Sequence, residues 1–329
     1  MLQLRKRWLI VLSLFLIFGV MAVCVWAGRE LASPPRRPLQ DYHQEFLADP
    51  SAHGVVVKAF MISDGTPCLL VEPDPADQLG PRGQRVRDQL RAKGLKLASP
   101  GNIIGTLVLV HGRKGRKEDY LLIAERLCAA GFRCLLPDMP GHGEHPGKHV
   151  TFGLTEAAIP SRVLHEAATQ FHFNPAPAGL MGMSMGGAVA MHAAAMPKAE
   201  WKALVIVSSF DRLEVAIHKN VSDRVGALLG SIWIEGAGVV FQSMTGHALS
   251  EIRSDISAGA ITMPTLIAHG TKDRVIPYES GKRLYAALPA ALEKQWIDVP
   301  DADHDNVLIT DFPIYATVAE WMLRHVTAP

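Results

Sequence analysis

The residues with the clearest chemical meaning form a short glycine-rich run, Gly182-Met183-Ser184-Met185-Gly186-Gly187. It lies between an apolar stretch at 178–181 and an alanine-rich stretch, a context that predicts a sharp turn from a strand into a helix. Glycines on both sides of the serine let that helix pass close to neighbouring strands. The turn pushes the hydroxyl out at the carboxyl edge of the sheet, so we predict that Ser184 is a nucleophile.

A serine hydroxyl is a weak nucleophile at neutral pH, so it needs a base to accept its proton and an acid to orient that base. Asp273 follows the apolar run 264–269, and His304 follows the apolar run 295–299. Both therefore lie at the carboxyl ends of predicted strands. The chain order of serine, acid and histidine is that of a known catalytic architecture, and we predict that Asp273 and His304 complete the site.

Other carboxylates compete for the acid role. Asp301, Asp303 and Asp305 surround His304 in sequence, but such close neighbours contact only their own loop. Asp138 also follows an apolar run, yet it precedes the nucleophile, and its glycine-rich surroundings predict a structural turn. We therefore keep Asp273.

The tetrahedral intermediate of acyl transfer needs hydrogen-bond donors aimed at its oxyanion. The residue after the nucleophile, Met185, offers one backbone amide. The second is expected from the loop His111-Gly112-Arg113-Lys114-Gly115, which follows the apolar run 106–110, and we assign it to the amide of Arg113. His111 itself is expected to pack under this loop as a structural histidine.

The elements that must position these groups alternate regularly. Apolar runs of strand length occur at 106–110, 133–136, 178–181, 202–207, 264–269 and 295–299, and helical patterns occur at 118–130, 156–171, 185–196, 278–288 and 306–326. Such alternation predicts a mostly parallel, doubly wound sheet with helices on both faces. The runs 55–62 and 67–71 flank an Asp-Gly turn and predict an antiparallel hairpin at its edge.

One interval interrupts this alternation. Residues 211–262 form a mixed apolar and glycine-rich helical stretch that is far longer than an ordinary connection. We predict a helical cap over the site, inserted after the sixth strand. Its apolar residues, Trp233, Phe241 and Met244 among them, would either bind an apolar substrate or form core.

Composition limits the class of partner and cofactor. Thirty-three basic and 32 acidic side chains leave a net charge of +1, which argues against a nucleic-acid partner. Four cysteines in 329 residues do not form a disulfide framework. His142, His145 and His149 are separated by glycines and a proline and have no cluster of further ligands, so no metal and no cofactor are expected.

The N-terminus predicts a membrane anchor over residues 1–28. Arg5, Lys6 and Arg7 precede an uncharged stretch, Trp8 to Ala27, that is long enough to cross a bilayer as a helix. Basic residues before the span place the N-terminus in the cytoplasm and the large domain on the other side. A signal peptide cleaved after Ala27 is the alternative, and it would also export the enzyme.

A proline-rich segment follows the predicted anchor. The run Ser33-Pro34-Pro35-Arg36-Arg37-Pro38 cannot continue a helix, so residues 29–54 are predicted as a linker. The catalytic domain is then expected over 55–329.

Together these motifs resemble the α/β-hydrolase superfamily, in particular its branch of carboxylesterases, monoacylglycerol lipases and serine aminopeptidase-like enzymes. The resemblance rests on His111-Gly112, the run 138–143, the run 182–187, His269-Gly270-Thr271-Lys272-Asp273 and His304. It implies the α/β-hydrolase fold, a triad of Ser184, Asp273 and His304, an oxyanion hole from the amides of Arg113 and Met185, and a lid after the sixth strand.

The predicted function is therefore hydrolysis of a carboxylic ester through an acyl-enzyme on Ser184. The expected substrate is a small-molecule ester, with a lipid or other acyl ester as one form of it. A peptidase or an acyltransferase would use the same triad, and a catalytically silent hydrolase fold used for binding is a third alternative.

Overall fold

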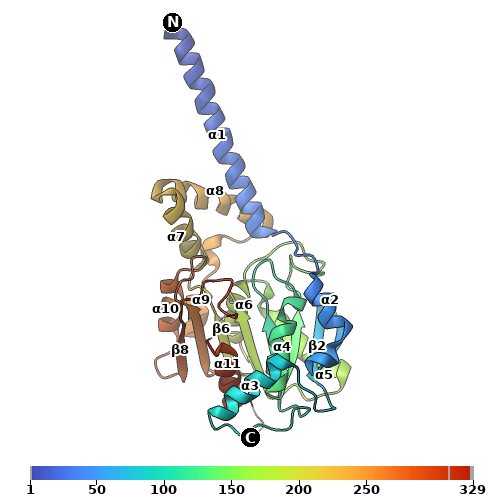
Figure 1. Cartoon of the computed structure of the whole chain (residues 1–329). Coiled ribbons are helices and arrows are strands. Elements are labelled where there is room, and N and C mark those ends of the chain that lie inside the picture. Colours follow the sequence, from blue (N-terminus) through green and yellow to red (C-terminus); the bar gives the residue numbers. More distant parts are fainter. Residues whose placement is uncertain (1, 310–311, 327–329) are drawn as a thin grey trace.

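A computed structural model describes residues 2–309 and 312–326, with side chains from residue 6 onward. Its centre is an eight-stranded sheet in the order β1-β2-β4-β3-β5-β6-β7-β8 (Figure 1). The strands are β1 Val55–Met61, β2 Pro67–Pro73, β3 Gly105–Val110, β4 Phe132–Pro137, β5 Ala178–Met183, β6 Trp201–Val207, β7 Thr265–Gly270 and β8 Lys294–Val299. Strands β3 to β8 pair in parallel, and the β1–β2 hairpin joins antiparallel to β4.

Helices cover both faces of this sheet. The helices of the described residues are α1 Leu2–Ala32, α2 Asp41–Ala48, α3 Pro81–Ala92, α4 Leu121–Ala129, α5 Ile159–Phe171, α6 Met185–Ala194, α7 Leu213–Val225, α8 Ala227–Thr245, α9 Ser254–Gly259, α10 Tyr278–Ala287 and α11 Ile314–His325, of which α1 projects away from the sheet (Figure 1). Buried side chains of α5, α6 and α10 form one apolar layer, and those of α3, α4 and α11 form the other. The predicted mostly parallel, doubly wound sheet is confirmed.

The connection from β6 to β7 holds helices α7, α8 and α9, so the structure has an insertion where residues 211–262 were predicted to form a cap. Phe241 is fully buried, with its ring 6.3 Å from that of Phe152. This cap residue is therefore core. Trp233 and Met244 are only partly buried.

The segment predicted as a linker, 29–54, is not a plain tether. Helix α1 continues to Ala32, and α2 and a 3-10 turn at Pro50–His53 follow within the segment. Phe46 of α2 is buried in the core between β1 and the helices beside it. A proline-rich start stops the first helix, but the apolar residues that follow are enough to dock a second one.

The last helix also differs from its prediction. Helix α11 begins at Ile314, after Pro313, and not at Asn306. The residues before Pro313 instead form turns up to residue 309. Residues 310–311, and residues 327–329 of the predicted domain, lie outside the described part.

The close packing of α6 against β3 generates a stability prediction. A Cβ atom on Gly186 would lie 2.1 Å from the carbonyl oxygen of Val110, which is backbone and cannot move aside. Gly186→Ala should therefore lower the free energy of unfolding by about 1–3 kcal/mol, as overpacked cores do. Urea unfolding of the full chain in detergent measures it.

Gly238→Ala is the matched control. Gly238 lies within helix α8, and a Cβ atom added to it would meet only Leu249 Cδ1, at 3.6 Å. Alanine should be neutral or stabilise the helix by up to about 1 kcal/mol. Equal unfolding midpoints for the two variants would contradict this account of the turn.

Candidate active site

Ser184 lies on the sharp turn between β5 and α6. Its backbone has φ 55° and ψ −120°, a left-handed conformation that a serine adopts only where the surrounding structure holds it. Two hydrogen bonds hold it here: the Ser184 amide donates to the Val207 carbonyl at 2.9 Å, and the Ser209 hydroxyl donates to the Ser184 carbonyl at 2.8 Å. The side chain is 9% exposed, so the hydroxyl is shielded yet reachable.

The structure brings the three predicted side chains together. His304 Nε2 lies 3.0 Å from Ser184 Oγ, and His304 Nδ1 lies 2.8 Å from Asp273 Oδ2. The other oxygen of Asp273 accepts amide hydrogen bonds from Val275 at 2.9 Å and Ile276 at 2.8 Å. The carboxylate is therefore held in its own loop while it faces the imidazole.

The competing acids are engaged elsewhere. Asp303 Oδ1 accepts the amides of Asp305 and Asn306, which closes its own turn. Asp301 pairs with Lys272 at 2.8 Å on the surface. Sequence proximity to the histidine did not bring these two carboxylates to its ring.

A buried histidine beneath the acid was missed by the sequence reasoning. His269 Nε2 lies 3.5 Å from Asp273 Oδ2 and 3.1 Å from the Ile276 carbonyl oxygen, and its ring stacks on Trp296. Burial lowers its pKa, so the ring is neutral and packs under the loop. His269 lies at the end of β7, four residues before Asp273, and this position could have indicated its contact with the acid.

The loop after β3 adjoins the serine. A Cβ on Gly112 would lie 3.5 Å from Ser184 Cβ. His111 is buried beneath the loop, where Nδ1 donates to the Gly112 carbonyl at 2.9 Å and Nε2 accepts the Met139 amide at 3.0 Å. Burial lowers the pKa of His111, which agrees with a neutral ring that makes two hydrogen bonds. It supports the loop and does not touch the serine.

The two amides predicted to form the oxyanion hole belong to residues next to Ser184 and next to Gly112 in the chain. Met185 is the first residue of α6, and helix N-termini leave amides free for a ligand. Among the hydrogen bonds of the described residues, none is donated by the amide of Arg113. The assignment of these two amides to an oxyanion hole stays a prediction.

Two side chains of the loop that follows β3, Arg113 and Lys114, contact Glu30 near the end of α1. The Arg113 guanidinium donates to the Glu30 carbonyl at 2.5 Å, and its other contact is the Glu30 carboxylate at 3.5 Å. Lys114 Nζ lies 2.7 Å from the same carboxylate. The N-terminal helix therefore contacts the loop beside Ser184 directly.

A pocket of about 610 Å³ opens at Ser184 and His304. Residues Pro35 to Pro38, from the segment predicted as a linker, form one of its walls. Arg36 holds that wall by donating to the carbonyls of Gly143 and Gly147, both at 2.9 Å. The sequence reasoning missed this role, although a pair of arginines between prolines was a visible signal.

Comparisons with known proteins support one superfamily for the chain. The family model described as serine aminopeptidase, S33 matches residues 101–246, which is less than half of the chain. A monoacylglycerol lipase from Mycolicibacterium smegmatis is 28% identical over 260 residues, covering 68% of this chain and 89% of that protein. The solved structure of the Pyrococcus furiosus esterase Pf2001 superposes with a TM-score of 0.63 at 17% identity, over 90% of this chain and 98% of that one. The chain belongs to the α/β-hydrolase superfamily.

A further relative of this α/β-hydrolase is the uncharacterized protein YfhR of Salmonella typhimurium, 28% identical over 215 residues. The match covers 62% of this chain and 66% of YfhR, just under two thirds of its length. These relatives support a hydrolase of the esterase, lipase or peptidase type.

Asp138 has a structural position in the α/β-hydrolase, away from the serine. It is fully buried and accepts hydrogen bonds from the Lys117 amide at 2.8 Å, the Glu144 amide at 2.9 Å and Lys117 Nζ at 3.0 Å. Burial alone would lower the pKa of Lys117, but Asp138, Glu144 and Glu118 together raise it above its usual value. The ion cluster closes the turn whose Met139 amide supports His111.

The closely spaced histidines His142 and His145 make different hydrogen bonds. His142 Nδ1 donates to the Pro140 carbonyl, and burial lowers the pKa of His142 to about 3. His145 contacts Thr66 Oγ1 and accepts the Gly147 amide. Within residues 2–309 and 312–326, no group of three or more histidine, cysteine or acidic side chains is placed to hold a metal ion.

Lys117→Met tests the ion cluster. It leaves the buried Asp138 carboxylate without its cation, which should cost about 3–5 kcal/mol of unfolding free energy. At neutral pH, below the 10.5 of an ordinary lysine, the stabilisation from the raised pKa is fully present, and it is lost as the pH rises through the folded-state pKa. Urea unfolding at pH 7 measures the loss.

The matched control is Lys219→Met, which breaks an exposed pair with Asp223 on α7. Exposed helical pairs contribute less than about 0.5 kcal/mol. A similar loss in both variants would show that burial does not strengthen the Lys117 cluster.

Proposed function

We propose that this α/β-hydrolase cleaves carboxylic esters through an acyl-enzyme on Ser184. The observation that carries the proposal is the continuous chain of hydrogen bonds from Ser184 Oγ through His304 to Asp273. It gives the serine a base within proton-transfer distance, and it gives the base an acid that fixes its orientation.

The reaction then follows from these positions. His304 Nε2 takes the hydroxyl proton as Ser184 Oγ attacks the carbonyl carbon, and Asp273 stabilises the imidazolium. The amides of Met185 and Arg113 donate to the oxyanion, and His304 returns the proton to the leaving alcohol. Water activated by the same histidine attacks the acyl-enzyme, which releases the acid and restores Ser184. Only water and groups of this chain take part.

The charges around the pocket favour an ester over an aminopeptidase substrate. Arg36, Arg37, Arg113 and Lys114 line it, against Asp119 and Asp305. Glu30 pairs with Arg113 and Lys114, and Asp119 pairs with Arg37, so the rim keeps a small positive excess, which disfavours a free ammonium group and suits a neutral ester. The similarity to a monoacylglycerol lipase agrees with an acyl ester.

A peptide amide is the second candidate, because the matching family model is described as serine aminopeptidase. An acyltransferase would share the acyl-enzyme and differ only in the acceptor. p-Nitrophenyl esters of increasing chain length, assayed beside amino-acid nitroanilides, distinguish ester cleavage from amide cleavage. Faster turnover of the nitroanilides would reverse our preference.

A fluorophosphonate probe tests the nucleophile. It should label Ser184, as mapped by peptide mass spectrometry, and Ser184→Ala should abolish labelling and lower kcat by about 10⁶-fold. Asp273→Asn should lower kcat on the order of 10⁴-fold, because the imidazole loses its orientation and charge partner.

Asp301→Asn, the same change on an exposed carboxylate of the histidine loop, should keep kcat close to that of the original chain. If the probe leaves Ser184 unlabelled while the protein stays folded, the chain is a binding module and not a hydrolase. If Asp301→Asn costs as much as Asp273→Asn, the acid is misassigned.

We also propose that α1 is an uncleaved membrane anchor. It is long and apolar enough to cross a bilayer, and its apolar side chains are exposed from Trp8 to Trp26. Its last turns belong to the domain, since Ala27 and Ala32 are buried and the Ala32 carbonyl accepts the Val150 amide at 2.8 Å. Cleavage after Ala27 would separate the span from a stretch that is built into the core. The basic residues before the span put the N-terminus in the cytoplasm.

The anchor predicts that the chain stays in the membrane pellet after an alkaline carbonate wash and keeps its N-terminal residues in mass spectrometry. In sealed vesicles of known orientation, added protease should digest the catalytic domain only from the non-cytoplasmic face. A mature chain that begins at Gly28 and appears in the soluble fraction would establish a signal peptide instead.

A further inference from the structure

Helix α8 of the cap packs directly on the helix proposed as the anchor. Small residues allow the approach: a Cβ on Gly236 would lie 2.5 Å from Cys24 Sγ, and a Cβ on Gly28 would lie 2.5 Å from the Ala237 carbonyl oxygen. Small residues at a helix–helix contact are typical of packing within membranes. Figure 1 shows α1 leaving the body of the protein at α8.

The cap also exposes apolar side chains beside α1. Leu228, Leu229 and Ile232 of α8 are 76%, 53% and 45% exposed. After α1, α8 is the other described helix whose length and composition would suit a bilayer. An exposed apolar face on a helix with few charges is expected to meet a lipid surface and not water.

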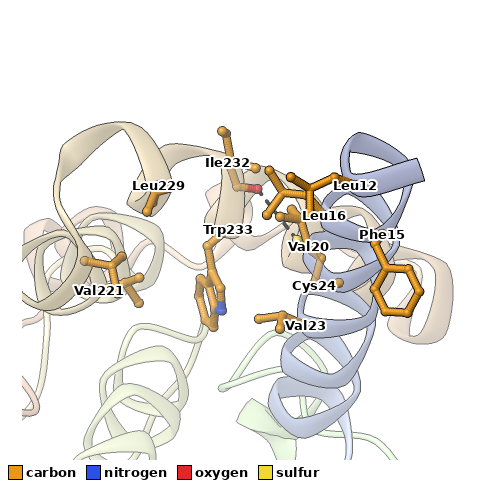
Figure 2. A pocket seen from close by; sticks show the side chains of 12 residues that line it. Leu12, Phe15, Leu16, Val20, Val23, Cys24, Val221, Leu229, Ile232 and Trp233 are labelled. Carbon is orange, nitrogen blue, oxygen red and sulfur yellow. Dashed lines mark hydrogen bonds between the residues drawn. The ribbon is translucent and has the colours of Figure 1, made fainter. Parts of the chain in front are cut away.

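Between these helices is an apolar groove of about 860 Å³. Leu12, Leu16 and Val23 of α1 form one side, and Val221 of α7 with Leu229 of α8 forms the other. Trp233 projects between Val221 and Val23 (Figure 2). The groove contains no charged side chain, so it suits a hydrocarbon chain.

We propose that this groove binds one acyl chain of a bilayer phospholipid. The inference rests on α1 being the anchor, because Leu12 to Val23 then lie at the depth of the hydrocarbon and the groove opens into it. A phospholipid is favoured as occupant by the charges where α1 meets the domain. There a second pocket is lined by Arg29, Arg36 and Lys148, which suit the phosphates of the headgroup layer.

The lipid contact lies close to the reaction centre. Arg36 lines both this basic pocket and the pocket at Ser184. The cap also reaches the loop that carries Asp273. Helix α7, which packs against α8, carries Asn220, and this side chain donates a hydrogen bond to the carbonyl of Arg274. Lipid in the groove would therefore contact α7 at Val221, next to Asn220, which bonds the residue after Asp273.

Quenching of Trp233 fluorescence tests the groove. The full chain, with Trp8→Phe and Trp26→Phe to remove the indoles of α1 and Ser184→Ala to keep lipids intact, is reconstituted in phosphatidylcholine vesicles. Phosphatidylcholine brominated on its acyl chains should quench part of the emission, and Trp233→Phe should remove that quenched part. The remaining tryptophans belong to the catalytic domain.

Filling the groove gives the matched comparison. Gly19 lines it, and a Cβ atom added there meets nothing within 4 Å, so Gly19→Phe should place a ring in the groove and lower the quenching severalfold. Met21→Phe adds an aromatic ring to the same helix outside the groove lining and should leave the quenching unchanged.

The failures are distinguishable. Loss of the chain from carbonate-washed membranes would reject the anchor itself. An anchored chain whose Trp233 is not quenched would reject only the acyl-chain site. If that unquenched chain forms an oligomer that Gly19→Phe dissociates, the groove belongs to a second copy of the protein, and the proposal is likewise overturned.

Discussion

Parallel pairing of β3, β5, β6, β7 and β8 is the constraint on which the site depends. Parallel strands end at the same edge of a sheet, so the loops that follow β3, β5, β7 and β8 meet there although the chain separates them widely. Ser184, Asp273 and His304 each follow one of these strands. Their side chains reach one another at hydrogen-bond distance because the backbone pairing has already aligned their loops.

Backbone packing then sets the position of the serine. Helix α6 passes so close to β3 that only glycine fits at 186, and the Ser184 amide is held by the next strand. Buried polar groups stabilise the loops around it: Lys117 with Asp138 closes one turn, and His111 joins that turn to the loop that carries Arg113. These buried groups hold the loops beside Ser184 in place without contacting the serine itself.

The N-terminal region links this site to helix α1 and to the cap. Glu30, near the end of α1, pairs with Arg113 and Lys114 of the loop beside the serine. The next residues form a wall of the pocket, and the cap helix α8 rests on α1. A change in the position of α1 would therefore alter its contacts with the loop that carries Arg113, with the pocket wall and with the cap.

Sequence reasoning recovered the elements that depend on local rules. Continuous apolar runs predicted the central strands, and turn chemistry predicted the elbow at Ser184. It did not predict α2, which forms within residues 29–54 after the proline-rich start, and it began the last helix at Asn306, whereas α11 begins at Ile314. The docking of Phe46 into the core stabilises α2, and the second difference is local, because Asp303 and Asn306 close a turn and the helix begins only after Pro313.

By itself the sequence determined the order and types of the reactive residues, the alternation of strands and helices, and an N-terminal stretch able to cross a bilayer, because each of these is written in neighbouring residues. Only the tertiary structure decided that Arg36 and Arg37 line the pocket, that Glu30 pairs with Arg113 and Lys114 of the loop beside Ser184, and that Phe241 is core while Leu229 faces a groove. These roles join residues tens to hundreds of positions apart. Such contacts depend on how whole elements pack in space, and no periodicity along the chain encodes them.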